Sequence, residues 1–277
     1  EKIFVPMFSM EDAEQVMKLF IGCKYDEMIH LADGLETRFS DVGHLLGSAS
    51  IEVWLKEADE KRKIVFSGDI GNLSKPLIKD PKFTTEADYV VMESTYGDRC
   101  HEARPDFVAT LTQIIQTAFD RGGSVIIPSF AVGRTQELLY FLRQIKEDNL
   151  VKGNEQFPVY VDSPLAVEAT SIFNKNQDSC FDGEALEYVN KGINPISFDD
   201  LILSVSSDDS KAINFDKRSK VIISASGMCE AGRIKHHLKH NLWQAENTIL
   251  FVVPKHFYIC SKQFRDYPNN YKQPSIL

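Results

Sequence analysis

The sequence lacks the apolar segments that enter or cross membranes. Its 277 residues contain no run approaching about 20 consecutive apolar residues, so a membrane-spanning helix is excluded. Residues 1–6 show neither the basic segment nor the apolar run and small-residue cleavage site of a secretory signal. We therefore expect a cytoplasmic protein with no membrane partner.

Paired cysteines and an excess of positive charge are missing as well. The five scattered cysteines form no C-x-x-C pair, which is typical of free thiols in a reducing compartment. They are Cys23, Cys100, Cys180, Cys229 and Cys260. The 31 basic residues are outnumbered by 40 acidic ones, giving a formal net charge of -9. Any contact with nucleic acid must therefore depend on a local basic patch.

Glycine loops for nucleotide binding are also absent. The glycines match neither a P-loop nor the G-x-G-x-x-G fingerprint, so we expect no nucleotide cofactor. What is present is an ordinary globular composition, 43% hydrophobic and 26% charged, long enough for one large domain or two ordinary ones.

The first hundred residues read mainly as strands. A capping-box pattern at Ser9 and apolar residues at helical spacing predict a packed helix over residues 10–20. After Gly34 the pattern changes to short runs separated by turns or charges, at residues 35–39, 49–55, 63–66 and 89–92. This pattern predicts a β-rich domain with antiparallel neighbours.

Strands and helices alternate in the rest of the chain. Strands are expected at residues 124–128, 159–161, 220–224 and 248–253. Helices are expected at residues 107–118, 134–145, from Pro164 onward, and at 232–242. Residues 153–156 and 205–210 are expected to be surface loops. The alternation predicts an α/β fold with a largely parallel sheet covered by helices, a Rossmann-like second domain.

Three polar side chains follow strands or turns in the first half. His44 lies in a glycine-flanked turn, Asp69 lies between two glycines after a buried strand, and Glu93 follows the next strand. Each has an ordinary alternative, because a single loop histidine is usually hydrogen-bonded or solvated and an aspartate often forms a turn. Together they could converge on one pocket.

The second half repeats a strand-to-helix turn with small polar residues. It occurs at residues 128–135, 161–164 and 225–233, where backbone N–H groups and an arginine could meet an anion. Serine and glycine at such turns are usually only caps. The next helix carries a phosphate-compatible basic patch of Arg233, Lys235, His236, His237, Lys239 and His240. His236 and His240 could hold a metal, but no supporting Glu or Cys lies nearby.

Six of these motifs, in order, resemble one family. The chain is similar to the metallo-β-lactamase-fold β-CASP nucleases, which include ribonuclease J and the pre-mRNA 3′-end endonuclease, and most of all to their prokaryotic branch. The motifs are residues 43–49, 66–71, 93–97, 128–137, 162–166 and 226–242. The resemblance implies a partial metallo-β-lactamase αββα sandwich at residues 1–103, a β-CASP domain at 104–253 and an unmatched tail at 254–277.

The resemblance also implies a chemistry. It implies a ribonuclease with two zinc ions per active site, in which His44 binds one zinc, Asp69 bridges both, and Glu93 orients a proton-donating histidine. Paired zinc ions would activate a water and offset charge on the phosphoryl transition state. The residues implied to bind RNA are Ser129, Arg134, Asp162, Ser163, Ser226, Gly227, Met228, Arg233, His236 and His237.

The sequence departs from the family at its metal site. The His-x-His-x-Asp-His motif and the two late histidine motifs are absent, which leaves two matched ligands where a catalytic zinc needs three. We therefore expect a fragment truncated at both ends, with loosely held zinc, little nuclease activity and uncovered apolar edges that favour homo-oligomers. The alternative is a non-catalytic RNA-binding or assembly subunit. A third possibility is a metallo-β-lactamase-fold hydrolase of small molecules. The three anion-directed loops argue against it, because such an enzyme does not need them.

Overall fold

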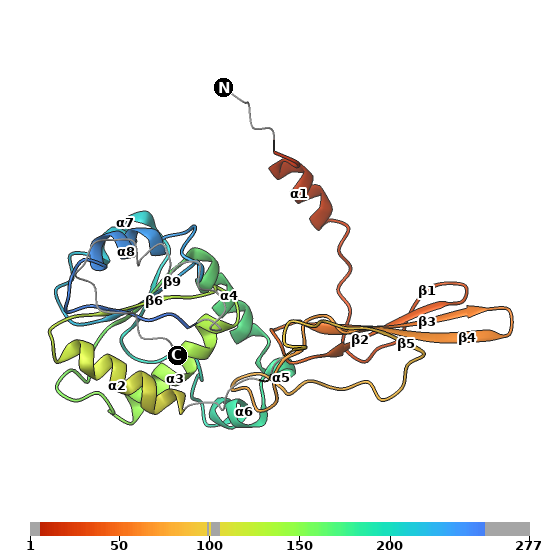
Figure 1. Cartoon of the computed structure of the whole chain (residues 1–277), viewed down its shortest axis with the longest axis horizontal. Helices are drawn as coiled ribbons and strands as arrows, with labels where there is room; N and C mark the ends of the chain where they lie inside the picture. Colours follow the sequence, from red (N-terminus) through yellow and green to blue (C-terminus); the bar gives the residue numbers. More distant parts are fainter. Residues whose placement is uncertain (1–5, 99, 101–105, 253–277) are drawn as a thin grey trace. The chain divides into compact units, whose positions relative to one another are not determined.

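The computed structural model describes residues 6–98, 100 and 106–252, and the expected tail at 254–277 lies outside this range. The chain divides into two compact units, each described by itself (Figure 1). The first comprises residues 1–42, 48–70 and 81–94, and the second comprises residues 43–47, 71–80 and 95–277. Two short segments, residues 43–47 and 71–80, thus belong to the second unit although the chain on either side of each belongs to the first.

The first unit contains one five-stranded sheet. Its order is β1-β2-β3-β4-β5, antiparallel from β1 to β4, with β5 parallel to β4. The strands are β1 (Ile29–Ala32), β2 (Leu35–Asp41), β3 (Ala49–Glu57), β4 (Glu60–Phe66) and β5 (Tyr89–Val91). The predicted antiparallel character is confirmed, and β1 is a strand that the sequence reading missed.

The predicted N-terminal helix forms but does not pack. The helix α1 (Met10–Met17) begins with the expected capping box between Ser9 and Asp12. None of its residues is buried, and Val16 and Phe20 are 51% and 71% exposed. The prediction of a packed helix over residues 10–20 is therefore wrong. Capping is sufficient to start the helix, whereas its apolar side chains contact no core in the described chain.

The second unit is built on a parallel sheet of order β10-β6-β9-β7-β8. Its strands are β6 (Val125–Pro128), β7 (Val159–Asp162), β8 (Leu201–Ser204), β9 (Val221–Ser224) and β10 (Thr248–Ile249). Its helices are α2 (Phe107–Phe119), α3 (Arg134–Glu147), α4 (Pro164–Lys175), α5 (Gln177–Cys180), α6 (Gly183–Asn190), α7 (Ser207–Ile213) and α8 (Ile234–Asn241). The expected Rossmann-like parallel sheet is confirmed.

Alternation along the buried strands creates two cores. Ile127, Val161 and Ile223 pack in the larger cluster with residues of α2, α3 and α4. Ile126 and Ile222, one residue out of phase, pack in the smaller cluster with residues of α7 and α8. Figure 1 shows α2 and α3 on one side of β6 and β9, and α7 and α8 on the other. The unit is thus a three-layer sandwich in which the three central strands, β6, β9 and β7, are covered on both faces.

The expected loop at residues 205–210 is wrong in part. Oγ of Ser206 caps α7 by accepting a hydrogen bond from the N–H of Asp209, and the Asp209 carboxylate accepts a hydrogen bond from the N–H of Ser206. This reciprocal cap starts a helix inside the segment. The predicted loop at residues 153–156 is confirmed as exposed and non-helical. In the described part of the chain, no helix has the length and apolarity needed to cross a membrane.

Candidate functional site

Two of the predicted site residues lie together in the first unit. Asp69 follows β4 and is exposed, and Glu93 follows β5 and is half-buried. Because β4 and β5 are parallel, with Phe66 opposite Val91, the two strands end at the same edge. The N–H of Ile70 donates to Oε1 of Glu93 at 2.7 Å, so the turn that carries Asp69 is tied to the Glu93 carboxylate.

His44 belongs to the second unit. It is half-buried, and its carbonyl accepts a hydrogen bond from Nζ of Lys75 at 3.0 Å. Across the described residues, no three His, Cys, Asp or Glu side chains are placed to hold one metal ion. His44 and Asp69 therefore do not by themselves complete the zinc centre that the family resemblance implies.

The strand ends of the second unit form one continuous edge. Pro128 of β6 is opposite Ser224 of β9, and Asp162 of β7 is opposite Ser204 of β8. The N–H of Ser129 donates to the Ser224 carbonyl at 3.0 Å, and Oγ of Ser224 donates to the Asp162 carbonyl at 2.8 Å. The turns that the sequence singled out after three separate strands are therefore neighbours in space.

The polar groups of the turn after β6 bond mainly to residues within the turn and at the start of α3. Ser129 is buried, and its Oγ lies 3.1 Å from Oγ1 of Thr135. The N–H of Gly133 donates to Oε1 of Gln136 at 2.7 Å, which caps the start of α3 internally. Arg134 is partly exposed and forms an ion pair with Glu137. This turn therefore presents one guanidinium whose charge is already balanced.

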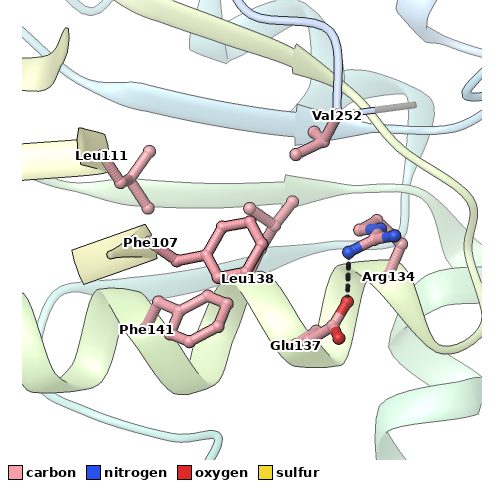
Figure 2. A pocket seen from close by; sticks show the side chains of 7 residues that line it. All are labelled: Phe107, Leu111, Arg134, Glu137, Leu138, Phe141 and Val252. Atoms are coloured by element: carbon pink, nitrogen blue, oxygen red, sulfur yellow. Dashed lines mark hydrogen bonds and ion pairs between the residues drawn. The ribbon is translucent and has the colours of Figure 1, made fainter. Parts of the chain in front are cut away.

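A small apolar pocket lies beside that ion pair. Figure 2 shows the Phe107, Leu138 and Phe141 side chains on one side and the Arg134–Glu137 pair on the other. The rings of Phe107 and Phe141 are stacked with centroids 5.3 Å apart. The full lining is Phe107, Leu111, Arg134, Glu137, Leu138, Phe141 and Val252. Its aromatic and aliphatic wall belongs to the packing between α2 and α3.

A buried carboxylate organises the next two turns. Oδ1 of Asp162 accepts from Oγ of Ser204 at 2.8 Å and from Nη1 of Arg233 at 2.7 Å. Oδ2 accepts from Oγ of Ser210 at 2.6 Å and lies 2.6 Å from Nε2 of His237. Burial by itself raises the pKa of Asp162, but the four donors outweigh burial and hold this pKa well below its ordinary value. The carboxylate is therefore ionised in the folded protein.

This network changes what the predicted residues can touch. Asp162 and His237 are fully buried, while Arg233 retains a side-chain exposure of 20%. Ser163 is also buried and caps α4 by accepting from the N–H of Ala166. Among these four sequence-predicted binding residues, only Arg233 reaches solvent to any useful extent. Ser204 and Ser210 were not predicted as members of the site.

The turn at residues 226–233 is folded back on the β6 turn. The N–H of Ser226 donates to the Ala231 carbonyl at 3.1 Å, which closes the loop. A Cβ on Gly227 would lie 3.2 Å from the Phe130 nitrogen, so a small residue suits this approach. Gly232 has a φ of +80°, and a Cβ there would lie 2.3 Å from the Ala225 carbonyl oxygen. Met228, between these glycines, is partly buried.

The helix that follows presents the predicted basic patch. Four side chains of α8 are exposed, namely Lys235, His236, Lys239 and His240. His237, on the same helix, is fully buried and does not belong to the exposed patch. The exposed groups follow Arg233 directly, so cationic side chains continue from the sheet edge along α8. We name these four exposed side chains and Arg233 the α8 basic strip.

The family match lies within the second unit, and the similar proteins match across both units. Residues 135–255 match the Beta-Casp domain. The chain is 35% identical to ribonuclease TTHA0252 of Thermus thermophilus over 89% of its own length and 55% of that protein. It is 30% identical to transcription termination factor FttA of Lokiarchaeum over 88% of its length and 38% of that protein. It is 26% identical to endoribonuclease YSH1 of Kluyveromyces lactis over 88% of its length and 31% of that protein.

These matches cover nearly all of the chain but only part of each relative. The chain spans about half the length of the Thermus ribonuclease and about a third of the other two proteins. The matched domain contains α3, the Asp162 network and α8, which together form the site described above. The chain contains a Beta-Casp domain over residues 135–255, and over nearly all of its length it is similar to a ribonuclease, a transcription termination factor and an endoribonuclease.

Proposed function

We propose that this chain takes part in RNA phosphodiester cleavage and that its second unit binds the RNA backbone. The α8 basic strip carries the proposal, because it begins with Arg233 at the carboxyl edge of the parallel sheet and continues along α8 with exposed basic side chains, in a chain that is acidic overall. Ligands of parallel α/β sheets bind outside this edge. Two of the similar proteins are a ribonuclease and an endoribonuclease, which supports RNA as the substrate.

Recognition on this surface is electrostatic. The exposed lysines can neutralise phosphates, and the two histidines add charge when protonated. Arg233 is paired with Asp162, so it contributes by donating from the part of its guanidinium that reaches solvent. We also propose that the turn at residues 226–233, which contains Ser226, Gly227 and Met228, lies against the same phosphates. The Ser226 N–H is not one of the proposed donors, because it already donates to the Ala231 carbonyl. None of these contacts reads a base edge, so we propose binding that tolerates many RNA sequences.

We propose that His44 and Asp69 are metal ligands and that Glu93 is a positioning residue beside them. Zinc would supply an activated water and offset transition-state charge. A catalytic zinc takes three protein ligands, and the described residues hold no such group. We therefore propose that the 277-residue chain alone neither retains two zinc ions nor hydrolyses RNA. Mass spectrometry of the dialysed protein tests this, because two retained zinc ions together with RNA hydrolysis would contradict it.

Fluorescence anisotropy with a labelled single-stranded RNA tests the RNA-binding proposal. Binding should weaken steeply with salt and should weaken further in the double variant Lys235→Ala and Lys239→Ala. The matched control is Lys175→Ala with Lys191→Ala, which removes two exposed lysines at the ends of α4 and α6. Equal loss of binding in both double variants, or no binding at low salt, would refute the proposed surface.

RNA binding, zinc content and RNA hydrolysis, measured together, separate the catalytic role from a second one. If a longer form of the protein binds RNA and retains zinc without cleaving, a non-catalytic RNA-binding or assembly subunit is the better description.

Location in the cytoplasm is also proposed, since the four described cysteines, Cys23, Cys100, Cys180 and Cys229, are free thiols. Cys260 lies outside the described residues.

A further inference from the structure

The Asp162 carboxylate joins three elements that are distant in sequence. Its four donors come from β8, α7, the residue before α8 and α8 itself, and they lie 42 to 75 residues further along the chain. An ionised carboxylate has two oxygens that together offer about four positions for accepting hydrogen bonds, and the four donors fill them. A carboxylate with four donors and no solvent exposure has no capacity left for a ligand, so a direct contact between Asp162 and RNA does not fit this geometry.

Arg233 is the member of the network that reaches the surface. Its Nη1 donates to Asp162 and to the Ser204 carbonyl, and its Nη2 donates to the Val205 carbonyl at 2.6 Å. A guanidinium has five N–H groups, which is more than these three bonds use. The exposed part of Arg233 can therefore donate to an external phosphate oxygen while the buried part stays held.

We propose that Asp162 and His237 are positioning residues that act on RNA through Arg233 and do not touch it. This inference rests on the proposed function and refines it. Asp162 fixes Nη1 of Arg233, and His237 with Ser210 fixes the orientation of the carboxylate through Oδ2. A planar guanidinium held in advance loses little rotamer freedom when a phosphate binds, which raises affinity.

A double-mutant cycle tests whether the effect passes through Arg233. We expect Arg233→Ala to weaken binding of a labelled single-stranded RNA about tenfold, as for one charge-assisted hydrogen bond. The slope of log affinity against log salt should fall by about 0.7. Asp162→Asn should weaken binding to a similar extent, and the double variant should bind no worse than Arg233→Ala alone. If Asp162→Asn acted only by disturbing the structure, adding it to Arg233→Ala would weaken RNA binding further.

Lys239 supplies the matched control, because it is an exposed cation of the same helix. Asp162→Asn and Lys239→Ala should be additive, whereas Asp162→Asn and Arg233→Ala should not be. Additivity in both cycles would overturn the inference. If the chain binds RNA and only the Lys235 and Lys239 changes weaken it, the positioning role fails while the proposed function stands. If the chain does not bind RNA at low salt, the proposed function itself fails.

Milder variants keep the test available if Asp162→Asn does not fold. Ser210→Ala removes one donor to Oδ2 and should weaken RNA binding by a few-fold in the wild-type background but not in Arg233→Ala. His237→Gln can still place an amide N–H near the position of Nε2, whereas His237→Leu cannot. Glutamine should restore affinity and the salt slope and leucine should not. Equal affinity for the two variants would contradict the role of His237.

Discussion

Nε2 of His237 lies 2.6 Å from Oδ2 of Asp162, and neither side chain is exposed to solvent. Because the aspartate is ionised, Nε2 must carry the proton in this bond. Nδ1 of His237 is buried without a hydrogen-bond partner in the described structure. The pair therefore fixes α8 against the end of β7 at the cost of one unsatisfied nitrogen, which suits a contact retained for geometry rather than for stability alone.

Asp162 should make the second unit sensitive to acid. Its pKa is lowered in the folded state, so its stabilising effect is present above the unfolded value near 3.9 and is lost as pH falls through the folded value. Asp162→Asn should lower the free energy of unfolding by about 3 kcal/mol at pH 7, because Arg233 and His237 lose their acceptor. Urea unfolding at decreasing pH measures this. The difference between the two proteins should be constant down to about pH 4 and should then shrink steadily as pH falls toward the lowered pKa of the folded protein. The exposed-site variant Asp148→Asn should show neither effect.

The sheet-and-helix order of the second unit could be predicted because each signal is local. Continuous apolar runs give β6, β7 and β9, and Pro164 after Ser163 marks the start of α4. The missed elements also carried local signals. Asp33-Gly34 is a two-residue hairpin turn that implies a strand on each side, and Ser206 with Asp209 is a capping box.

The candidate site was less predictable because its contacts are not local. The sequence placed Asp162, Arg233 and His237 in one functional region through family resemblance, but gave no means of finding which of them is buried. Ser204 and Ser210 lie 42 and 48 residues from Asp162, and no spacing rule relates them. The prediction that residues 10–20 form a packed helix was wrong for a related reason, because an apolar helical face does not identify the surface that would cover it.

Gly232 should be intolerant of substitution in a way that Gly153 is not. Both residues have positive φ, so alanine strains either backbone by about 1 kcal/mol. Only at Gly232 would the added Cβ meet backbone, the Ala225 carbonyl at 2.3 Å, whereas Gly153 faces open space. Gly232→Ala should therefore reduce both the unfolding free energy, by more than about 2 kcal/mol, and RNA affinity. Equal loss of stability in the two variants, measured by urea unfolding, would contradict the proposed crowding at the α8 turn.

Glu52 should stabilise the first unit. It is buried and accepts hydrogen bonds from Arg38, Lys63 and Thr84, and the two cations lie over the Trp54 ring. Burial raises the pKa of Glu52, but these donors outweigh it and lower the pKa overall, so its contribution persists above about pH 4.3 and is lost in acid. Glu52→Gln should cost about 3 kcal/mol at pH 7.

Trp54 fluorescence can report that change separately from the second unit. The chain has two tryptophans, so Trp243→Phe leaves Trp54 as the only one. In this background, Glu52→Gln should lower the urea midpoint of the Trp54 signal while the helical signal of the second unit is retained. A midpoint unchanged at pH 7 would show that the Glu52 cluster does not stabilise the sheet.

The β5 edge should drive self-association of the isolated chain. β5 ends the sheet of the first unit, and Tyr89, Val90 and Val91 are all more than half exposed. An apolar edge strand offers unpaired backbone groups to a second copy, and lysine on such an edge opposes this pairing. Val90→Lys should therefore raise the monomer fraction in light scattering across a concentration series. Ile172→Lys, which places the same charge on an exposed residue of α4, should not. A chain that is monomeric before either substitution would show that this edge does not pair, because the wild-type protein already presents the unprotected strand.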